Sequence, residues 1–316
     1  MNILVTGSSW FIGFHTAKKL LEIWYNIIGI DNENDYYDIE LKKNRRNILQ
    51  WFSNFTFYNI SIWDRENLEH IFQTEKIEKV CHLAAQAGVR YSIENPFAYI
   101  ESNIVWFHNI IFLAQKYKVK NFVYASSSSV YWNNEKQPFC VDDRVDHPIS
   151  LYAATKKSNE IIAHSYSHIH NLPTIWLRFF TVYWPYSRPD MAMLKFALKM
   201  KNKECIEIYN NWEMFRDFTY IDDIVDGILK SLDSNFHYEI FNLWNDKPVK
   251  LLSMIELLEK SIGIEAIKKY LPMQAWDVSA TWSDIEYTKK KLNWKPKTSL
   301  EEGIEKFGMW FREYYK

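Results

Sequence analysis

The fold of this chain is decided by residues 1–31, MNILVTGSSWFIGFHTAKKLLEIWYNIIGID. Residues 3–5 predict a short buried strand, and the apolar spacing after Gly13 predicts a helix. A second apolar run follows and ends on Asp31. This order of a strand, a tight turn, a helix and a second strand ending in an acid is typical of a βαβ unit that binds a dinucleotide. In such a unit the turn and the helix N-terminus receive the pyrophosphate, and the acid binds the ribose hydroxyls.

The turn departs from the usual glycine pattern at its centre. Gly7 and Gly13 stand at the first and third glycines of T-G-x-x-G-x-x-G, but Trp10 stands at the second. The second glycine allows the phosphates to approach bare backbone. Trp10 therefore predicts an obstacle in the seat of the cofactor, and the alternative interpretation is an α/β unit whose turn binds nothing.

The composition excludes several classes of protein. Lys and Arg total 38 against 39 Asp and Glu, so no overall field draws the chain to nucleic acid or to an anionic membrane. The longest apolar runs are shorter than a bilayer span, and no signal peptide is evident. Cys81, Cys140 and Cys205 lie far apart in the sequence, which argues against a zinc site and a disulfide framework. We therefore expect a cytoplasmic protein without a bound metal.

Segments typical of strands and helices alternate over the first 180 residues. Strands are predicted at 3–5, 27–30, 55–58, 79–84, 121–125 and 174–180, and helices at 39–49, 64–72, 95–117 and 152–169. This alternation predicts an α/β fold, a Rossmann-like doubly wound parallel sheet. Further helices are predicted at 191–200, 221–232, 251–261 and 300–314, with a strand at 239–243. We divide the chain into residues 1–180 and a smaller C-terminal α/β substrate lobe, 181–316, with room for later segments to return to the first sheet.

A tyrosine and a lysine one helical turn apart form the second landmark. Tyr152 and Lys156 share one face of the predicted helix, where the ammonium would lower the pKa of the phenol toward neutrality, so that it can act as an acid or a base. Ser127 ends the fifth predicted strand, at the edge where parallel sheets bind ligands. Alone, the serine run would be a polar loop that caps a helix. Together with the predicted βαβ unit, Ser127, Tyr152 and Lys156 predict a hydride-transfer site opposite a nicotinamide. Tyr287 and Lys291 have the same four-residue spacing, and we interpret them as an ordinary surface pair.

Longer motifs along nearly the whole chain resemble one family. They include residues 6–7 (TG), 11–13 (FIG), 30–32 (IDN), 82–91 (HLAAQAGVRY), 124–131 (YASSSSVY), 152–156 (YAATK), 178–183 (RFFTVY), 188–191 (RPDM) and 216–223 (RDFTYIDD). Together they resemble the extended short-chain dehydrogenase/reductases, and within them the nucleotide-sugar 4-epimerases that act on UDP-glucuronate. The resemblance implies a Rossmann lobe that binds NAD and a smaller lobe that binds the nucleotide sugar.

The resemblance also implies the chemistry. Hydride would leave C4 of the sugar for NAD and return to the other face of a transient 4-keto sugar, which converts UDP-glucuronate to UDP-galacturonate. Tyr152 would take the proton from O4, Ser127 would share the hydrogen bond to O4, and Lys156 would hold Tyr152 ionised and bind the nicotinamide ribose. The implied cofactor contacts are Gly7, Trp10, Phe11, Ile12, Gly13, Asp31, Asn32, Ala84, Ala85, Asn103 and Lys156. The implied substrate contacts are Arg90, Ser127, Thr181, Arg188, Arg216 and Asp277.

Two arginines and two helices carry the remaining expectations. Arg216 matches the family's arginine on the UDP phosphates, a role that suits a guanidinium fork. Arg188 is the candidate for the sugar carboxylate, against the alternative of a surface arginine in a Pro-flanked loop. In the family the helices at 95–117 and 152–169 pair across a two-fold axis, and both segments are rich in apolar residues here. We therefore expect a homodimer with Trp106 at or near its seam.

Tryptophan repeatedly replaces glycine when the chain is compared with the family pattern. The chain has 14 tryptophans and 8 glycines, where average usage would give about 22 glycines. The replaced positions are 10, 24, 106, 132, 184, 212, 244 and 276. A non-glycine residue in the left-handed region costs about 1–2 kcal/mol. Strain at half of these positions would therefore rival a domain's whole stability of about 5–15 kcal/mol.

Three alternative functions are open at this point. A 4,6-dehydratase carries Asp-Glu after the active-site hydroxyl, whereas Ser128 and Ser129 follow Ser127 here. A UDP-glucuronate decarboxylase would also have an acid in the serine run, which contains none. A catalytically silent protein, which binds a nucleotide sugar or is merely structural, would result if Trp10 and the other tryptophans prevent NAD binding.

Overall fold

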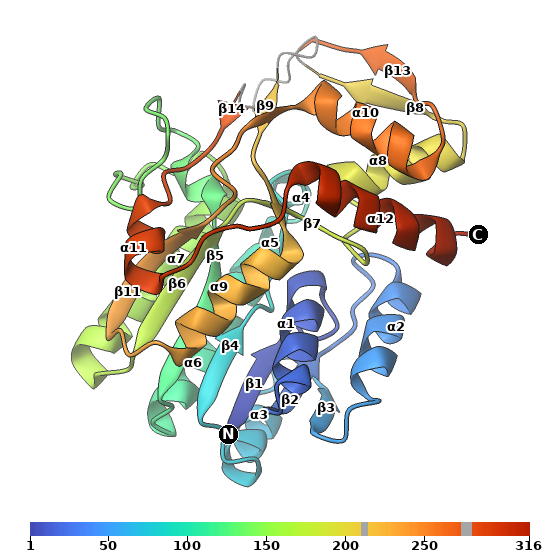
Figure 1. Cartoon of the computed structure of the whole chain (residues 1–316). Helices are drawn as coiled ribbons and strands as arrows, with labels where there is room; N and C mark the ends of the chain where they lie inside the picture. Colours follow the sequence, from blue (N-terminus) through green and yellow to red (C-terminus); the bar gives the residue numbers. More distant parts are fainter. Residues whose placement is uncertain (210–213, 273–279) are drawn as a thin grey trace.

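The computed structural model describes residues 1–209, 214–272 and 280–316 (Figure 1). Its centre is a seven-stranded sheet with the strand order β11-β6-β5-β4-β1-β2-β3. The strands are β1 (Asn2–Thr6), β2 (Asn26–Asp31), β3 (Phe55–Asn59), β4 (Lys79–His82), β5 (Asn121–Ser127), β6 (Thr174–Phe179) and β11 (Tyr238–Leu243). All six pairings between them are parallel. The predicted doubly wound parallel sheet is therefore confirmed.

Helices cover both faces of this sheet. One face is covered by α1 (Phe11–Glu22) and α9 (Ile221–Asp233), and the other by α3 (Arg65–Thr74), α6 (Trp106–Lys116) and α7 (Leu151–His170). Successive residues of a strand point to opposite faces, so in β1 Ile3 and Val5 belong to the first cluster and Leu4 to the second. This is why the strands are apolar throughout, as expected for a sheet buried on both sides. The helix α2 (Ile39–Leu49) packs beside α1.

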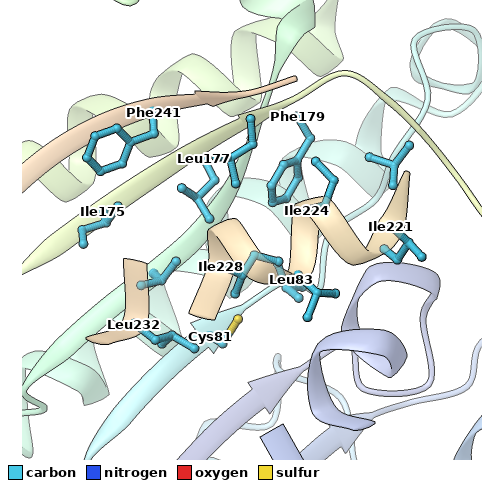
Figure 2. Close-up of a cluster of buried hydrophobic side chains, with 14 of the residues drawn as sticks. Cys81, Leu83, Ile175, Leu177, Phe179, Ile221, Ile224, Ile228, Leu232 and Phe241 are labelled. Carbon is cyan, nitrogen blue, oxygen red and sulfur yellow. The ribbon is translucent and has the colours of Figure 1, made fainter. Parts of the chain in front are cut away.

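The helix α9 returns from the C-terminal half of the chain to the sheet. Its apolar residues recur every three or four positions and therefore form one stripe. Figure 2 shows this stripe against side chains from β4, β6 and β11, where burial of each large aliphatic side chain contributes about 1.5–3 kcal/mol. The stripe consists of Ile221, Ile224, Ile228 and Leu232. The helix and β11 thus tie the second half of the chain to the first.

A smaller lobe covers the carboxyl edge of the sheet (Figure 1). Its helices are α8 (Ala192–Lys201), α10 (Leu251–Ile262) and α12 (Leu300–Tyr314), and they share a third hydrophobic cluster. Its strands are short: β7 (Thr181–Tyr183) pairs with β10 (Phe218–Tyr220), β8 (Cys205–Ile208) with β13 (Ile267–Tyr270), and β9 (Phe215–Arg216) with β12 (Val249–Lys250) and β14 (Ala280–Thr281). A last helix, α11 (Glu286–Leu292), packs against β11 and α9.

The predicted single helix at 95–117 is wrong in detail. The structure has the short helices α4 (Tyr91–Glu94) and α5 (Pro96–Ile100), a π-helical turn (Glu101–Val105) and then α6. Asn95 interrupts the first two, because its side chain caps α5 by accepting from the Ala98 N–H and the next residue is Pro96. Within the described residues, no helix combines the length and apolar character needed to span a bilayer.

The tryptophans at expected glycine positions strain the backbone much less than predicted. Trp24 has a φ of 69°, but Trp10, Trp106 and Trp132 have φ of −80°, −74° and −63°. No other described tryptophan has a positive φ. Trp212 and Trp276 lie outside the described residues. The prediction of summed strain is therefore wrong for the described part, because most of these positions do not require a left-handed backbone.

Candidate active site

Three cavities follow one another along the carboxyl edge of the sheet. The first lies beside the β1–α1 turn and the end of β2. The second is lined by the serine run and the start of α7. The third lies between the sheet and the smaller lobe. Trp10 and Ala85 line both the first and the second cavity, and Thr181 lines both the second and the third, so each cavity adjoins the next.

The β1–α1 turn requires both of its remaining glycines. Gly7 has a φ of 73°, and a Cβ there would lie 2.9 Å from the Ala84 nitrogen. A Cβ on Gly13 would lie 2.0 Å from the Gly7 oxygen. Glycine at both places therefore allows the tight turn and the close approach of the helix, as the βαβ prediction requires.

The first cavity has the lining expected for an adenosine site. Asp31, at the end of β2, lines it and accepts from the Ser9 N–H at 3.0 Å and the Glu33 N–H at 2.8 Å. Burial raises the pKa of Asp31, and these two hydrogen bonds oppose the rise. Asn32, Ser61, Ala84 and Ala85 also line this cavity. A carboxylate at this place can accept ribose hydroxyls.

Asn103 does not line any of these cavities, although it was predicted to contact the cofactor. It is buried, its Oδ1 accepts from the Gln86 N–H at 2.8 Å, and its Nδ2 donates to the Gln86 carbonyl and to Thr155 Oγ1, both at 3.0 Å. It therefore holds the loop after β4 against α7, and the backbone of that loop lines the first cavity.

NAD fits this end of the site in part. Three buried polar atoms beside the turn and the first cavity have no hydrogen-bond partner among the residues that the structure describes: Ser8 Oγ, Ser61 Oγ and Gln86 Nε2. Such atoms are normally satisfied, so they are suited to a polar ligand. Two indoles, those of Trp10 and Trp106, narrow the same cavity. Trp106 is partly buried and packs against the second hydrophobic cluster.

The indole of Trp10 stands at the passage from the first cavity to the second. Its ring centroid lies 4.8 Å from the Tyr37 ring and 5.9 Å from the Tyr36 ring. Two cations flank it, with Lys42 Nζ at 5.0 Å and Arg188 Cζ at 5.8 Å from the ring centroid. The indole is thus held by aromatic and cation–π contacts at the place where a pyrophosphate would connect the two cavities.

The second cavity brings together the three predicted catalytic side chains, with Phe11 and Ile12 on its wall. Ser127 Oγ donates to Ser129 Oγ at 3.1 Å, and Lys156 Nζ donates to the Ala125 carbonyl at 3.0 Å. No carboxylate is among the described residues that line this cavity. The arrangement offers a hydroxyl, a phenol and an ammonium to one bound molecule, which suits proton transfer at a sugar hydroxyl.

The pKa values in this cavity differ from the predicted pattern. Burial raises the pKa of Tyr152, and the groups that oppose the rise are Ser127 and Arg188. Burial lowers the pKa of Lys156 to about 8. The prediction that Lys156 lowers the pKa of Tyr152 is therefore wrong for this structure, because burial dominates and the ammonium is directed to a backbone carbonyl.

A buried ion pair fixes the end of β5. Ser126 Oγ donates to Glu160 at 2.6 Å, and Arg178 donates to the same carboxylate at 3.0 and 2.9 Å. Burial acts to raise the pKa of Glu160, but Arg178 outweighs it and the pKa is lowered. Glu160 was not among the predicted site residues, because nothing in the pattern of an amphipathic helix marks a carboxylate that faces the sheet. This pair orients the strand that presents Ser127.

The predicted substrate residues divide between two cavities. Arg188 lines the second, and its Nε lies 3.3 Å from Asp190. Arg90 and Arg216 line the third cavity, as do Lys195 and Lys199 of α8, which were not among the predicted site residues. The predicted Asp277 lies outside the described residues. Glu94, Asp190 and Glu207 line the same cavity, so its cationic side chains exceed its carboxylates by one. The two guanidinium groups among the cations suit the phosphates of a nucleotide. No group of three or more metal-ligating side chains occurs within the ranges described above.

Known proteins with related sequences and structures share this architecture. The sequence profile described as GDP-mannose 4,6 dehydratase matches residues 4–307. The chain is 51% identical over 314 residues to the uncharacterized protein MJ1055 of Methanocaldococcus jannaschii, covering 99% of this chain and 96% of the relative. It is 43% identical over 311 residues to a UDP-glucuronate 4-epimerase of Thermodesulfobacterium geofontis, covering 98% and 96%.

A solved structure extends the likeness to the whole fold. The structure of a UDP-glucuronic acid 4-epimerase from Bacillus cereus, in complex with UDP-glucuronic acid and NAD, superposes with a TM-score of 0.92 at 33% identity. The match covers 100% of both chains. The three cavities described above therefore lie in a fold that holds a dinucleotide and a UDP-sugar in that relative.

Proposed function

The chain belongs to the family described as GDP-mannose 4,6 dehydratase, within the extended short-chain dehydrogenase/reductases, and on this premise we propose that it is an NAD-dependent UDP-sugar 4-epimerase. The reaction is the interconversion of UDP-glucuronate and UDP-galacturonate. The observation that carries the proposal is the second cavity, which holds Ser127, Tyr152, Lys156 and Arg188 together. It lies between the first cavity and the third, which has two arginines in its lining.

NAD, when bound, supplies reversible hydride transfer at C4 of the sugar. Tyr152 takes the proton from O4 and later returns it, and Ser127 hydrogen-bonds the same oxygen. Arg188 assists, because its charge favours the tyrosinate form of Tyr152. Lys156 contributes a donor for the nicotinamide ribose. The 4-keto sugar then turns in the cavity and offers its other face, which inverts C4.

The cofactor contacts extend along the first cavity. Gly7, Gly13 and Trp10 belong to the turn, and Asp31, Asn32, Ala84 and Ala85 line the first cavity. Asp31 and Asn32 would bind the adenosine ribose, and Ala84 and Ala85 would contact the dinucleotide. Lys156 completes these contacts at the nicotinamide end. Trp10 must move for the pyrophosphate to rest on the turn, so we expect weak NAD binding by the chain as it stands.

Arg188 is proposed to bind the carboxylate of the sugar, and Arg216 the phosphates of UDP. Arg188 is close enough to Tyr152 to oppose the rise of its pKa, so it lies near the reacting end of the sugar. Arg216 lies in the third cavity with Arg90, at the nucleotide end, and Thr181 stands between the two. A guanidinium can bind a carboxylate or a phosphate through two parallel hydrogen bonds.

A dehydratase or a decarboxylase is less well supported. Both of those activities need a carboxylic acid next to the active-site hydroxyl, and the described lining of the second cavity offers none. Ser128 and Ser129 occupy the places after Ser127 and are buried. A silent, nucleotide-sugar-binding protein is the alternative that the position of Trp10 keeps open.

We also propose that the protein is a cytoplasmic homodimer. Exposed apolar side chains gather on neighbouring segments, with Phe97 77%, Ile100 42% and Ile161 60% exposed on α5 and α7. Burial of such a patch against a second copy would remove it from water. Sedimentation should give a dimer at micromolar concentration, and a monomer would contradict this assignment. We retain residues 1–180 as the dinucleotide lobe and 181–316 as the sugar lobe, with α9 and β11 packed on the first.

The proposed reaction is tested by incubating the purified chain and its Trp10→Gly variant with UDP-glucuronate and NAD. We expect UDP-galacturonate to accumulate with the variant and much more slowly with the parent chain. Chromatography separates the two UDP-sugars. Formation of a pentose or of a 6-deoxy sugar nucleotide, or no conversion by the variant at saturating NAD, would overturn the proposal.

A further inference from the structure

A buried arginine of α2 connects the cofactor turn with the loop that carries Arg188. Arg45 has no exposed surface. Its Nη1 donates to the Ser9 carbonyl at 2.9 Å and to the Tyr37 hydroxyl at 2.5 Å, and its Nη2 donates to the Tyr186 carbonyl at 2.5 Å. Ser9 belongs to the β1–α1 turn, and Tyr186 lies two residues before Arg188. One guanidinium therefore holds three segments that are far apart in the sequence.

The acceptors around Arg45 are all neutral oxygens. Within the described ranges no ion pair includes Arg45, and its Nε has no hydrogen-bond partner. A buried guanidinium without a carboxylate keeps its desolvation cost, and an apolar side chain of similar volume would avoid it. The contacts of Arg45 thus indicate a role in geometry rather than in stability.

The loop that Arg45 holds has an unfavourable backbone conformation. Tyr186 has a φ of 61°, which a bulky residue rarely adopts. The turn is closed by the Ser187 N–H, which donates to the Trp184 carbonyl at 3.1 Å. Such a conformation persists where the surroundings determine it. The hydrogen bond from Arg45 to the Tyr186 carbonyl fixes this residue.

A second contact holds the same loop from α1. His15 Nε2 lies 3.2 Å from the Pro185 carbonyl. Burial first, and then the charge of Arg45, lower the pKa of His15, so its ring is neutral. Arg45 is therefore the charged member of the two contacts, and its planar fork reaches Ser9 and Tyr186 at once.

We propose that Arg45 is a positioning residue that sets the place of Arg188 relative to the cofactor turn. Because Tyr186 is fixed, the position of Arg188, two residues later, is restricted. Arg188 lines the second cavity, with its Cζ 5.8 Å from the centroid of the Trp10 ring and its Nε 3.3 Å from Asp190. This inference rests on the proposed function, in which Arg188 binds the sugar carboxylate. Arg45 thereby determines specificity for an acidic sugar without touching it.

The test measures discrimination between two sugars rather than turnover. Calorimetric titration of the full chain with UDP-glucuronate and with UDP-glucose gives the ratio of their affinities, and these ligands differ only at C6. We expect Arg45→Met to lower this ratio at least fivefold, with the affinity for UDP-glucose changed less than twofold. Arg188→Met should lower the ratio at least as much. Arg65→Met, at an arginine of α3 that stacks on Phe112, is the matched control and should leave the ratio unchanged.

Each other outcome overturns a different statement. If Arg188→Met lowers the affinity ratio but Arg45→Met keeps the parental ratio, the proposed role of Arg45 is overturned and the proposed function stays intact. An equal loss of affinity for both sugars in Arg45→Met would show a merely structural role and also overturn it. A ratio that does not respond to Arg188→Met would overturn the carboxylate assignment in the proposed function. If Arg45→Met does not fold, Arg45→Gln replaces it, since its amide reaches at most one of the two carbonyls, and the same ratios decide.

Discussion

The two ends of α1 each carry a tryptophan where the family pattern predicts glycine, and the two tryptophans differ in what they disturb. Trp10 precedes the helix with φ −80° and ψ 166°, a conformation open to any residue, but its ring stands between two cavities. Trp24 follows the helix with a φ of 69°, and its side chain is 84% exposed. Glycine provides room at the first end and backbone freedom at the second. Substitutions at the two ends should therefore change different properties, ligand binding at one and stability at the other.

The largest expected effect is on the rate of epimerisation, in the cavity that Trp10 borders. On a Trp10→Gly background, Tyr152→Phe should lower the rate of epimerisation by about 10²–10⁴-fold, because the proton of O4 loses its acceptor. The affinity for UDP-glucuronate should change little. Tyr287→Phe, at the other tyrosine that stands four residues before a lysine, should retain the parental rate. Product formation followed by chromatography checks this, and near-parental turnover in Tyr152→Phe would rule out its role.

A smaller effect is expected from the lysine beside it. Lys156→Met on the same background should weaken NAD binding by about 10–100-fold, since a charged hydrogen bond contributes about 1.5–3 kcal/mol. The comparison is with Lys157→Met, the next residue of α7, whose ammonium pairs with Glu160. Calorimetry with NAD measures both variants. Equal affinities in Lys156→Met and its parent would remove Lys156 from the cofactor contacts.

The same lysine should make the stability of the protein depend on pH. Its pKa is lowered from 10.5 to about 8 by burial. Below pH 8 the lysine is charged in both the folded and the unfolded state, and its burial opposes folding. Between about pH 8 and 10.5 the unfolded chain binds more protons than the folded protein. The free energy of unfolding should therefore rise with pH in this range. Lys156→Met should flatten that rise. Urea unfolding at several pH values tests this, and an unchanged slope would contradict it.

The smallest expected effect is at the other end of α1. The Trp24 N–H donates to the Leu21 carbonyl and the Tyr25 N–H to the Leu20 carbonyl, the arrangement that ends a helix with a left-handed residue. Trp24→Gly should raise the free energy of unfolding by about 1 kcal/mol. Trp51 is 85% exposed and has no positive φ, so Trp51→Gly should give no gain. Equal responses of the two variants would show that backbone strain at Trp24 has no influence.

The sequence predicted the sheet and most of its helices because their apolar patterns are long enough to be periodic. It missed α11 and the two- to four-residue strands of the smaller lobe, which are too short to show a period. It also missed Arg45 and Lys42, which belong to a polar helix and look like surface residues. Their burial depends on Tyr37 and Tyr186, and such tertiary contacts leave no local signal.

The ligand end was predictable in its residue types and less so in its electrostatics. Ser127, Tyr152 and Lys156 line one cavity, as expected from a strand end next to a helix start. The direction of the pKa shift of Tyr152 could not be predicted from its four-residue spacing to Lys156, because the shift depends on burial and on Arg188. The same limit applied to the tryptophans, since a glycine pattern does not say whether room or conformation is needed.

The most direct test of this account is calorimetric titration of NAD into the chain and into its Trp10→Gly variant. Loss of about two charged hydrogen bonds to the pyrophosphate, each worth about 1.5–3 kcal/mol, predicts that the variant binds NAD about a thousandfold more tightly. Trp24→Gly, at the opposite end of the same helix, should bind NAD like the parent. Equal affinities of the parent and Trp10→Gly would contradict the claim that the indole occupies the seat of the pyrophosphate.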